Sequence, residues 1–189
     1  MKKRLSLIQM AVYVNEVEYN YARVQELLSQ ALSEKPDIIV LPETWNTGFH
    51  PSKDLINISD RNGERTKALL STFAKEHNVN IVGGSVAVAK EDLVFNTSYA
   101  YNREGKLVGE YSKMHGFSPA KEDQYFASGT HTTHFELDGI PCSTVICYDI
   151  RFPELVRMAA LSNTELLFVP AQWPTMRCLL YTSPSPRDR

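Results

Sequence analysis

The sequence lacks the features of membrane, disulfide-rich and nucleic-acid-binding proteins. No apolar run approaches the roughly 18 residues of a membrane helix, and the short N-terminal run is broken by Gln9 without a cleavage site, as in a strand. Its three cysteines, Cys142, Cys147 and Cys178, form no Cys-x-x-Cys pair, which argues against disulfides and zinc. Its Lys and Arg residues are scattered and the formal net charge is -2, so no basic stripe favours nucleic acid. We expect a cytoplasmic protein with no metal, nucleic-acid or membrane partner.

The composition that remains is that of an ordinary globular protein. Of the 189 residues, 43% are hydrophobic and 22% are charged, enough for one domain with a sizeable core. Strand and helix patterns alternate without an internal repeat, which predicts a layered α/β fold. The predicted strands cover residues 4–12, 37–41, 79–88, 93–101, 106–112, 131–137, 140–147 and 165–169, and the predicted helices cover residues 15–33, 64–77 and 153–161.

Two charged residues directly follow predicted strands. Glu43 stands between Pro42 and Trp45, which would partly desolvate it, and desolvation raises a carboxyl pKa toward the range of a general base. Lys113 follows the strand at residues 106–112, where a fixed ammonium could stabilise an oxyanion. Position alone leaves ordinary alternatives open, since Glu43 could cap a helix or lie on the surface and Lys113 could be a solvated charge.

Cys147 ends a predicted strand shortly before the helix that Pro153 opens. At such a turn, backbone N–H groups and the helix dipole lower a thiol pKa, so we expect Cys147 to be a nucleophile. The alternative of a buried structural cysteine fits Cys142, in mid-strand, better. A nucleophile, a base and an oxyanion stabiliser, each at a strand end, form the set that covalent acyl transfer needs.

Three segments resemble the signature segments of the nitrilase, or carbon–nitrogen hydrolase, superfamily. They are Leu-Pro-Glu at 41–43, the Lys113 segment with His115 and Phe117, and Cys-Tyr-Asp-Ile-Arg-Phe-Pro-Glu at 147–154, followed by Val-Pro-Ala-Gln-Trp-Pro at 169–174. They stand in the family's order, and the resemblance runs from Leu5 to Trp173. It implies a four-layer αββα sandwich.

The resemblance also implies a catalytic triad of Glu43, Lys113 and Cys147. Many members have a second glutamate in the loop after the lysine, a place that Glu122 occupies, although Asp123 beside it leaves a surface-charge interpretation open. In the implied mechanism the cysteine attacks an amide, the lysine and the next backbone N–H hold the oxyanion, and the glutamate moves protons. The product of the first half is a thioester, and no cofactor is required.

Within the superfamily, Cys-Tyr-Asp-Ile-Arg-Phe resembles the amidases, whereas true nitrilases tend to have Cys-Trp-Glu. The nearest resemblance is to ω-amidase-like enzymes, which hydrolyse small 2-oxo acid amides such as 2-oxoglutaramate. We expect Tyr148, Arg151 and Trp173 to contact the substrate. Arg151 could pair with a substrate carboxylate or be structural, and Trp173 could line the pocket or be core.

The C-terminal end departs from the pattern. We expect residues 1–176 to form a carbon–nitrogen hydrolase domain that is truncated at its C-terminus, since family members continue well beyond Trp173 and form homodimers when complete. Residues 177–189 are aperiodic and rich in Ser and Pro; they are either a disordered terminus or non-native, and we favour the second.

Two other functions are alternatives to that of a catalytic amidase. One is a catalytically incompetent fragment, or a non-catalytic member that binds a ligand without turnover. The other is a glutamine amidotransferase, which needs a Gly-x-Cys-x-Gly elbow and a later histidine. Ile146 and Tyr148 flank Cys147 and no histidine follows it, so this second alternative is nearly excluded.

Overall fold

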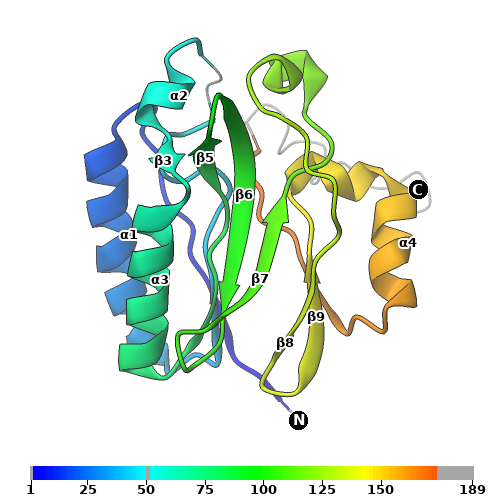
Figure 1. Cartoon of the computed structure of the whole chain (residues 1–189). Coiled ribbons are helices and arrows are strands. Elements are labelled where there is room, and N and C mark those ends of the chain that lie inside the picture. The colour runs from blue at the N-terminus through cyan, green and yellow to red at the C-terminus, as the bar shows by residue number, and fades with distance from the viewer. Residues whose placement is uncertain (1, 50–51, 174–189) are drawn as a thin grey trace, which may run out of the picture.

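The computed structural model describes residues 2–49 and 52–173, which form four layers in the order helices, sheet, sheet, helix (Figure 1). Helices α1 (Val17–Ala31) and α3 (Glu64–His77) cover the outer face of the larger sheet, and α4 (Pro153–Leu161) covers the smaller sheet. The αββα sandwich implied by the family resemblance is confirmed. Among the described residues, no helix is long and apolar enough to cross a bilayer.

The larger sheet has seven strands in the order β1-β2-β4-β6-β5-β3, with β7 paired to β6. Strands β1, β2 and β4 run parallel, whereas β6 is antiparallel to each of its neighbours β4, β5 and β7. Their bounds are β1 Leu5–Leu7, β2 Ile38–Val40, β3 Asp60–Arg61, β4 Asn80–Val82, β5 Val86–Lys90, β6 Leu93–Tyr101 and β7 Leu107–Ser112. The predicted hairpin of β6 and β7 is therefore present.

The smaller sheet has the order β10-β9-β8 and lies face to face with the larger one. Its strands are β8 (His134–Leu137), β9 (Ile140–Thr144) and β10 (Leu166–Phe168), with β9 antiparallel to β8 and parallel to β10. The strand pair that the sequence predicted on either side of residues 138–139 is present as β8 and β9.

Side-chain alternation along the strands separates two cores. Ile39 of β2 packs with helix residues such as Leu70 of α3. Its neighbour Ile38 points the other way and packs with Val82 of β4 and Phe135 of β8, between the two sheets. Both faces of the central strands are therefore buried, which explains why the sequence shows continuous apolar runs there.

The prediction of one strand at residues 79–88 was wrong, because β4 and β5 are separate strands. Gly83 and Gly84 lie between them, and Gly84 has a φ of 62°. A Cβ at Gly84 would lie 2.0 Å from the carbonyl oxygen of Pro42. A glycine is needed there, because the chain must turn while it packs against the segment that leads to Glu43.

Several short elements were not predicted because they span too few residues to show a period. They are α2 (Leu55–Ile58), β3 and the 3₁₀ helices η2 (Ser118–Ala120), η3 (Glu122–Gln124) and η4 (Cys147–Arg151). The 3₁₀ helix η1 (Leu32–Glu34) overlaps the end of the helix predicted at residues 15–33. The predicted tail at residues 177–189, with Cys178, lies outside the described residues.

Candidate active site

Glu43 follows β2 and is completely buried. Its segment lies along the β4–β5 connection, where the Ser85 N–H donates to the Pro42 carbonyl at 3.0 Å and the Trp45 N–H donates to the Ser85 carbonyl at 3.1 Å. Thr44, the next residue, has a left-handed φ of 42°. This backbone turn directs Glu43 inward, so the alternatives of a helix cap and a surface acid do not hold.

Lys113 directly follows β7 and is also buried, with 3% of its surface exposed. Its N–H donates to the Asn96 carbonyl on β6 at 2.8 Å, and its carbonyl accepts from the Gly129 N–H at 2.9 Å. Its ammonium donates to Glu43 Oε1 at 2.9 Å. The alternative of a solvated lysine is therefore wrong.

Glu122, in η3, is the second carboxylate around Lys113. It is completely buried, and its Oε1 and Oε2 accept from Lys113 Nζ at 2.9 and 2.8 Å. Its Oε2 also accepts from the Phe117 N–H at 2.7 Å. Glu43 after β2, Lys113 after β7 and Glu122 in η3 thus form one buried, hydrogen-bonded cluster, and the surface-charge interpretation of Glu122 does not hold.

Cys147 lies at the turn after β9, at the start of η4, with a left-handed φ of 48°. Its N–H donates to the Pro170 carbonyl at 2.9 Å, and its thiol lies close enough to the Glu43 carboxylate for the charge of Glu43 to act on it. A positive φ at a residue other than glycine is a strained conformation that persists where the surroundings enforce it. The structure therefore brings Glu43, Lys113, Glu122 and Cys147 together.

The expectation that the turn lowers the thiol pKa was wrong. Burial, and then the negative charge of Glu43, raise the pKa of Cys147 well above its usual value. The α-helix that was to supply the dipole begins only at Pro153, and a short 3₁₀ turn stands in between. The resting Cys147 side chain is consequently a thiol, which would need a base in order to act as a nucleophile.

The pKa values of the other two groups fit that need. Burial raises the pKa of Glu43, although the charge of Lys113 partly opposes the shift. Burial would lower the pKa of Lys113, but the charges of Glu43 and Glu122 outweigh it and raise this pKa. The cluster thus contains a permanent cation beside a carboxylate with increased proton affinity.

Asn96 and Asp149 were not predicted as site residues. The Asn96 side chain donates to Glu43 Oε1 at 3.1 Å and to Glu122 Oε1 at 3.2 Å. The buried Asp149 accepts from Tyr111 Oη at 2.7 Å and from the N–H groups of His115 and Ile146 at 2.9 and 3.0 Å. Asp149 therefore links the loop after Lys113 to the cysteine turn.

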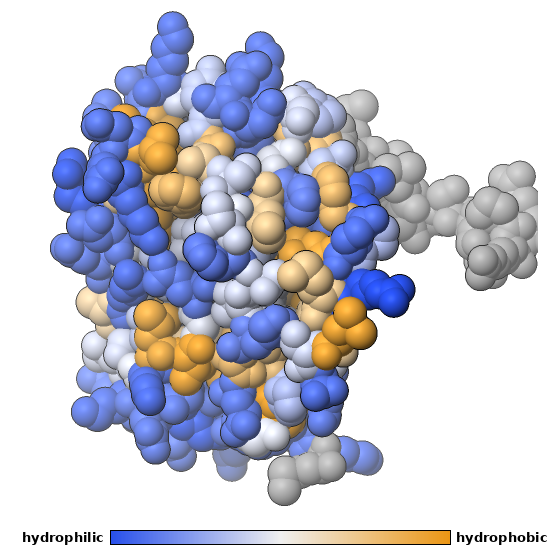
Figure 2. Space-filling view, turned by 45° about the vertical axis from the view of Figure 1, so that its right-hand side comes forward, coloured by the Kyte–Doolittle hydropathy of each residue, from blue (hydrophilic) through white to orange (hydrophobic). Residues whose placement is uncertain are grey.

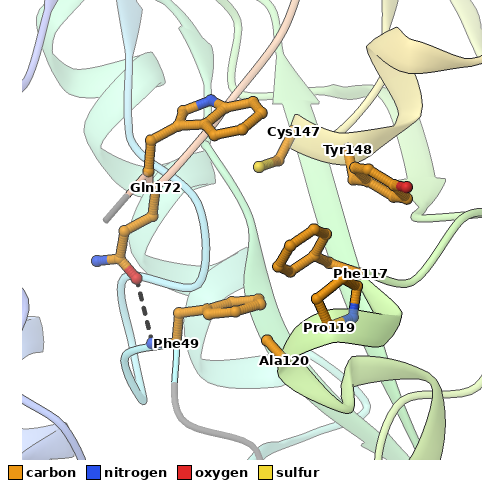
Figure 3. A pocket seen from close by; sticks show the side chains of 8 residues that line it. Phe49, Phe117, Pro119, Ala120, Cys147, Tyr148 and Gln172 are labelled. Atoms are coloured by element: carbon orange, nitrogen blue, oxygen red, sulfur yellow. Dashed lines mark hydrogen bonds between the residues drawn. The ribbon is translucent and has the colours of Figure 1, made fainter. Parts of the chain in front are cut away.

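A cavity of about 280 Å³ opens beside Cys147 and is lined mainly by aromatic and apolar side chains. The Cys147 sulfur points into it, with Phe117 and Phe49 across the space (Figure 3). The lining residues are Phe49, Phe117, Pro119, Ala120, Cys147, Tyr148, Gln172 and Trp173. Such a cavity suits a small organic molecule.

Of the three predicted substrate contacts, Tyr148 and Trp173 line this cavity, whereas Arg151 does not. Arg151 is exposed, and its guanidinium carbon lies 5.6 Å from the centre of the Trp173 ring. Gln172 was not predicted; its N–H donates to Glu43 Oε2 at 2.9 Å and its side-chain oxygen accepts from the Phe49 N–H at 3.1 Å (Figure 3). The last described strand thus leads directly into the site.

Among residues 2–49 and 52–173, no group of three or more His, Cys, Asp or Glu side chains has the arrangement of a metal site. Cys142, predicted to be structural, is buried between the sheets.

Comparisons with known proteins agree with this geometry. Residues 4–185 match the family model described as carbon-nitrogen hydrolase. The 2-oxoglutaramate amidase of Bacillus subtilis is 37% identical over 177 residues, which cover 94% of this chain and 68% of that protein. The omega-amidase NIT2 of Danio rerio is 30% identical over 89% of this chain and 63% of its own length.

A solved structure supports the same assignment. The crystal structure of Saccharomyces cerevisiae Nit3, a member of the nitrilase superfamily, superimposes with a TM-score of 0.83 at 25% identity, over 95% of this chain and 68% of that chain. The predicted resemblance to ω-amidase-like members of the nitrilase superfamily is confirmed. The chain belongs to the carbon–nitrogen hydrolase family.

Proposed function

We propose that the chain hydrolyses the C–N bond of a small amide through a thioester on Cys147, with Glu43 as the general base and Lys113 as the oxyanion stabiliser. The observation that carries the proposal is the set of contacts that joins the Cys147 thiol, the Glu43 carboxylate and the Lys113 ammonium beside the cavity. A buried thiol with a raised pKa next to a carboxylate is a nucleophile that its base activates during attack.

In the first half-reaction, the Cys147 thiol gives its proton to Glu43 while sulfur forms a bond to the amide carbon. The carbonyl electron pair moves to oxygen, where Lys113 and the backbone N–H of Tyr148 stabilise it. The tetrahedral adduct then collapses, the C–N bond breaks, and Glu43 returns the proton to nitrogen. Ammonia leaves, and an acyl thioester remains on Cys147.

In the second half-reaction, water replaces ammonia. Glu43 accepts a proton from water as its oxygen attacks the thioester, the same groups hold the second oxyanion, and the C–S bond breaks. The proton passes to sulfur, which gives the carboxylic acid and the free thiol. Substrate and water thus use one base in turn, which predicts ping-pong behaviour.

Glu122 supports Lys113 in this scheme. Among the described residues, the three hydrogen bonds of the Lys113 ammonium go to carboxylate oxygens: one to Glu43 and two to Glu122. We propose that Lys113 gives up one of its two bonds to Glu122 when the oxyanion forms, while the second bond keeps the ammonium in place. The positive charge then stays within reach of the developing negative charge at little reorganisation.

For the substrate, we propose the amide of a short 2-oxo acid with a carboxylate at its other end. The support comes from the relative named 2-oxoglutaramate amidase and from the size of the cavity. Tyr148 and Trp173 would pack against the carbon chain, and Arg151, close to the Trp173 ring, would attract the carboxylate at the rim.

The experiment is an ammonia-release assay with 2-oxoglutaramate, glutamine, N-carbamoyl amino acids and simple nitriles. We expect turnover of 2-oxoglutaramate, an acyl adduct on Cys147 in rapid-quench mass spectrometry, and no turnover by Cys147→Ala. Cys142→Ala is the matched control, because Cys142 is the other described free cysteine and lies in the core between the sheets. Turnover by Cys147→Ala would refute the mechanism, and ligand binding without turnover would favour the non-catalytic alternative.

We further propose that the protein works in the cytoplasm as a homodimer. A reducing compartment suits a mechanism that depends on a free thiol. The surface is mainly hydrophilic with several apolar patches between (Figure 2), and α4 exposes Met158 and Leu161 to 50% and 71%. Light scattering would test the dimer, and a monomeric mass at high concentration would refute it.

A further inference from the structure

Asn96 lies between the two carboxylates of the site. It belongs to β6 and is 1% exposed, and its side-chain nitrogen donates to Oε1 of both Glu43 and Glu122, at 3.1 and 3.2 Å. A primary amide has two N–H protons, so one side chain can serve both acceptors. Asn96 is therefore the neutral counterpart of Lys113, which donates to the same two oxygens.

The chemistry of the neighbours fixes the orientation of this amide. If oxygen and nitrogen were exchanged, the amide oxygen would face two carboxylate oxygens at hydrogen-bond distance, which is repulsive. With the nitrogen toward Glu43 and Glu122, both contacts are favourable and both strengthen as the acceptors become ionised.

The surroundings of Glu43 explain why a second donor matters. The charged and titratable groups that face it are Lys113 after β7, Glu122 in η3 and Cys147 in η4. One ammonium thus serves two buried carboxylates, and an unbalanced negative charge in a dry site is expensive. A neutral N–H donor to each carboxylate reduces that repulsion without adding a charge.

We propose that Asn96 is a positioning residue that keeps Glu43 ionised and aimed at the Cys147 thiol. The inference rests on the proposed roles of Glu43 and Cys147. Without the amide, Glu43 would hold its proton at higher pH and would accept the thiol proton only above that pH. Glu122 would also lose the N–H donor that reduces its repulsion with Glu43.

The backbone gives Asn96 a fixed place for this role. Its carbonyl accepts from the Lys113 N–H at 2.8 Å, and it pairs with Ala87 of β5. Ala87 in turn exchanges two hydrogen bonds with the side chain of Asn46, at 2.9 and 3.0 Å, in the segment after Glu43. These hydrogen bonds therefore fix Asn96 on β6 relative to Lys113, which follows β7, and relative to the segment that carries Glu43.

The test is the rate at which iodoacetamide alkylates Cys147, measured across pH by mass spectrometry of the Cys147 peptide. In this reaction a C–S bond forms, iodide leaves, and the thiol proton passes to Glu43 or to water. The acidic limb of the pH profile reports the ionisation of Glu43. The measurement can be made without knowing the natural substrate. The proteins compared are wild type, Asn96→Leu, Asn96→Ser, Glu43→Gln and Ser98→Ala.

Ser98→Ala is the matched control. Ser98 is buried on the same face of β6, and its hydroxyl has no hydrogen-bond partner among the described residues. Leucine has nearly the shape of asparagine but no donor, and serine retains one donor in case the Asn96→Leu protein does not fold. Thermal unfolding of each variant identifies any general loss of structure.

We expect Asn96→Leu to move the acidic limb upward by about one pH unit, the shift that loss of one hydrogen bond to a charged group produces. Asn96→Ser should give a smaller shift in the same direction, and Ser98→Ala none. A folded Asn96→Leu or Asn96→Ser protein with the wild-type limb would overturn the inference about Asn96. An unchanged limb in Glu43→Gln would instead overturn the proposed role of Glu43, so the two failures are distinguishable.

Discussion

Two clusters of acids and bases lie at opposite ends of β2, and they behave in opposite ways. Asp37 precedes β2 and belongs to a network with Asp138, Arg103 and Lys3. Arg103 binds both acids, with 2.8 Å to Asp37 and 2.7 Å to Asp138, and Lys3 lies 2.8 Å from Asp138. The network ties the two sheets together, since Asp138 is in the β8–β9 turn and Arg103 is in the β6–β7 turn.

The cluster at the other end of β2 also contains carboxylates and cations, but it has fewer cations for each carboxylate. Glu43 and Glu122 share one cation, Lys113, and none of the three side chains is more than 2% exposed. In the network around Arg103, two cations serve two acids, and the side chains are 14% to 31% exposed.

The difference decides the direction of the pKa shifts. Hydrogen bonds from Arg103 lower the pKa of Asp138, and the Arg4 backbone N–H, with Lys3 and Arg103, lowers that of Asp37. Burial raises the pKa of Glu43 despite its contact with Lys113. Carboxylates thus have a lowered pKa where solvent and cations are plentiful, and a carboxylate has a raised pKa, as the proposed proton carrier needs, where both are scarce.

Removing the single cation of the buried cluster should have the largest effect. Lys113→Met leaves Glu43 and Glu122 buried without a charge partner, which destabilises a fold by about 3–5 kcal/mol. Loss of the oxyanion stabiliser should reduce kcat by roughly a hundred- to a thousand-fold. Chemical denaturation and ammonia release measure the two effects, and a fully stable Lys113→Met protein would contradict the contrast between the clusters.

Glu43→Gln should separate activity from stability. We expect kcat to fall roughly a hundred- to ten-thousand-fold through loss of the general base. Stability at neutral pH should stay the same or rise, because ionised Glu43 opposes folding: its raised pKa means that stability is lost as pH rises from the unfolded value to the folded value. A large fall in melting temperature would show instead that Glu43 is mainly structural.

Asp138→Asn should give the reverse result. A lowered pKa means that Asp138 contributes stability above the pKa of the unfolded chain, and that this contribution disappears as pH falls through the folded value. We expect a loss of about 1 kcal/mol at neutral pH that vanishes in acid, with unchanged kcat. Unfolding curves recorded across acidic pH give the comparison, and a pH-independent loss would argue against the network.

Lys3→Met should have the smallest effect. Its ammonium lies 2.8 Å from Asp138, but Arg103 already makes two hydrogen bonds to that carboxylate. We expect a loss of a few tenths of a kcal/mol, reduced further by salt, and no change in kcat. A loss equal to that of Asp138→Asn would mean that Lys3, and not Arg103, holds the network.

Much of the fold could be predicted from local patterns. The helices at residues 64–77 and 153–161 and the strand at residues 93–101 have the predicted bounds, since a 3.6-residue period or a Pro at the first turn marks each helix. The β4–β5 division was missed because both strands are apolar, although the Gly83-Gly84 pair between them is a turn signal in the sequence.

Site residues that directly follow strands could be predicted from the sequence. Residues that belong to the site only through contacts with distant parts of the chain could not. Glu43, Lys113 and Cys147 could be found, and the family pattern added Glu122. Asn96 was missed. The run of polar residues at 96–98 within an otherwise apolar strand was an available signal, and the structure shows that these residues are buried. The thiol pKa was predicted in the wrong direction because burial depends on the tertiary structure.

The buried, protonated state of Cys147 has a consequence for how readily oxidants inactivate the protein. Peroxide oxidises thiolates, and enzymes that maintain a resting thiolate are readily converted to sulfenic and sulfinic acids. A cysteine whose pKa is raised by burial and by Glu43 is nucleophilic only while its proton is being taken up. Between turnovers such an enzyme should tolerate hydrogen peroxide that would inactivate a thiolate-based hydrolase.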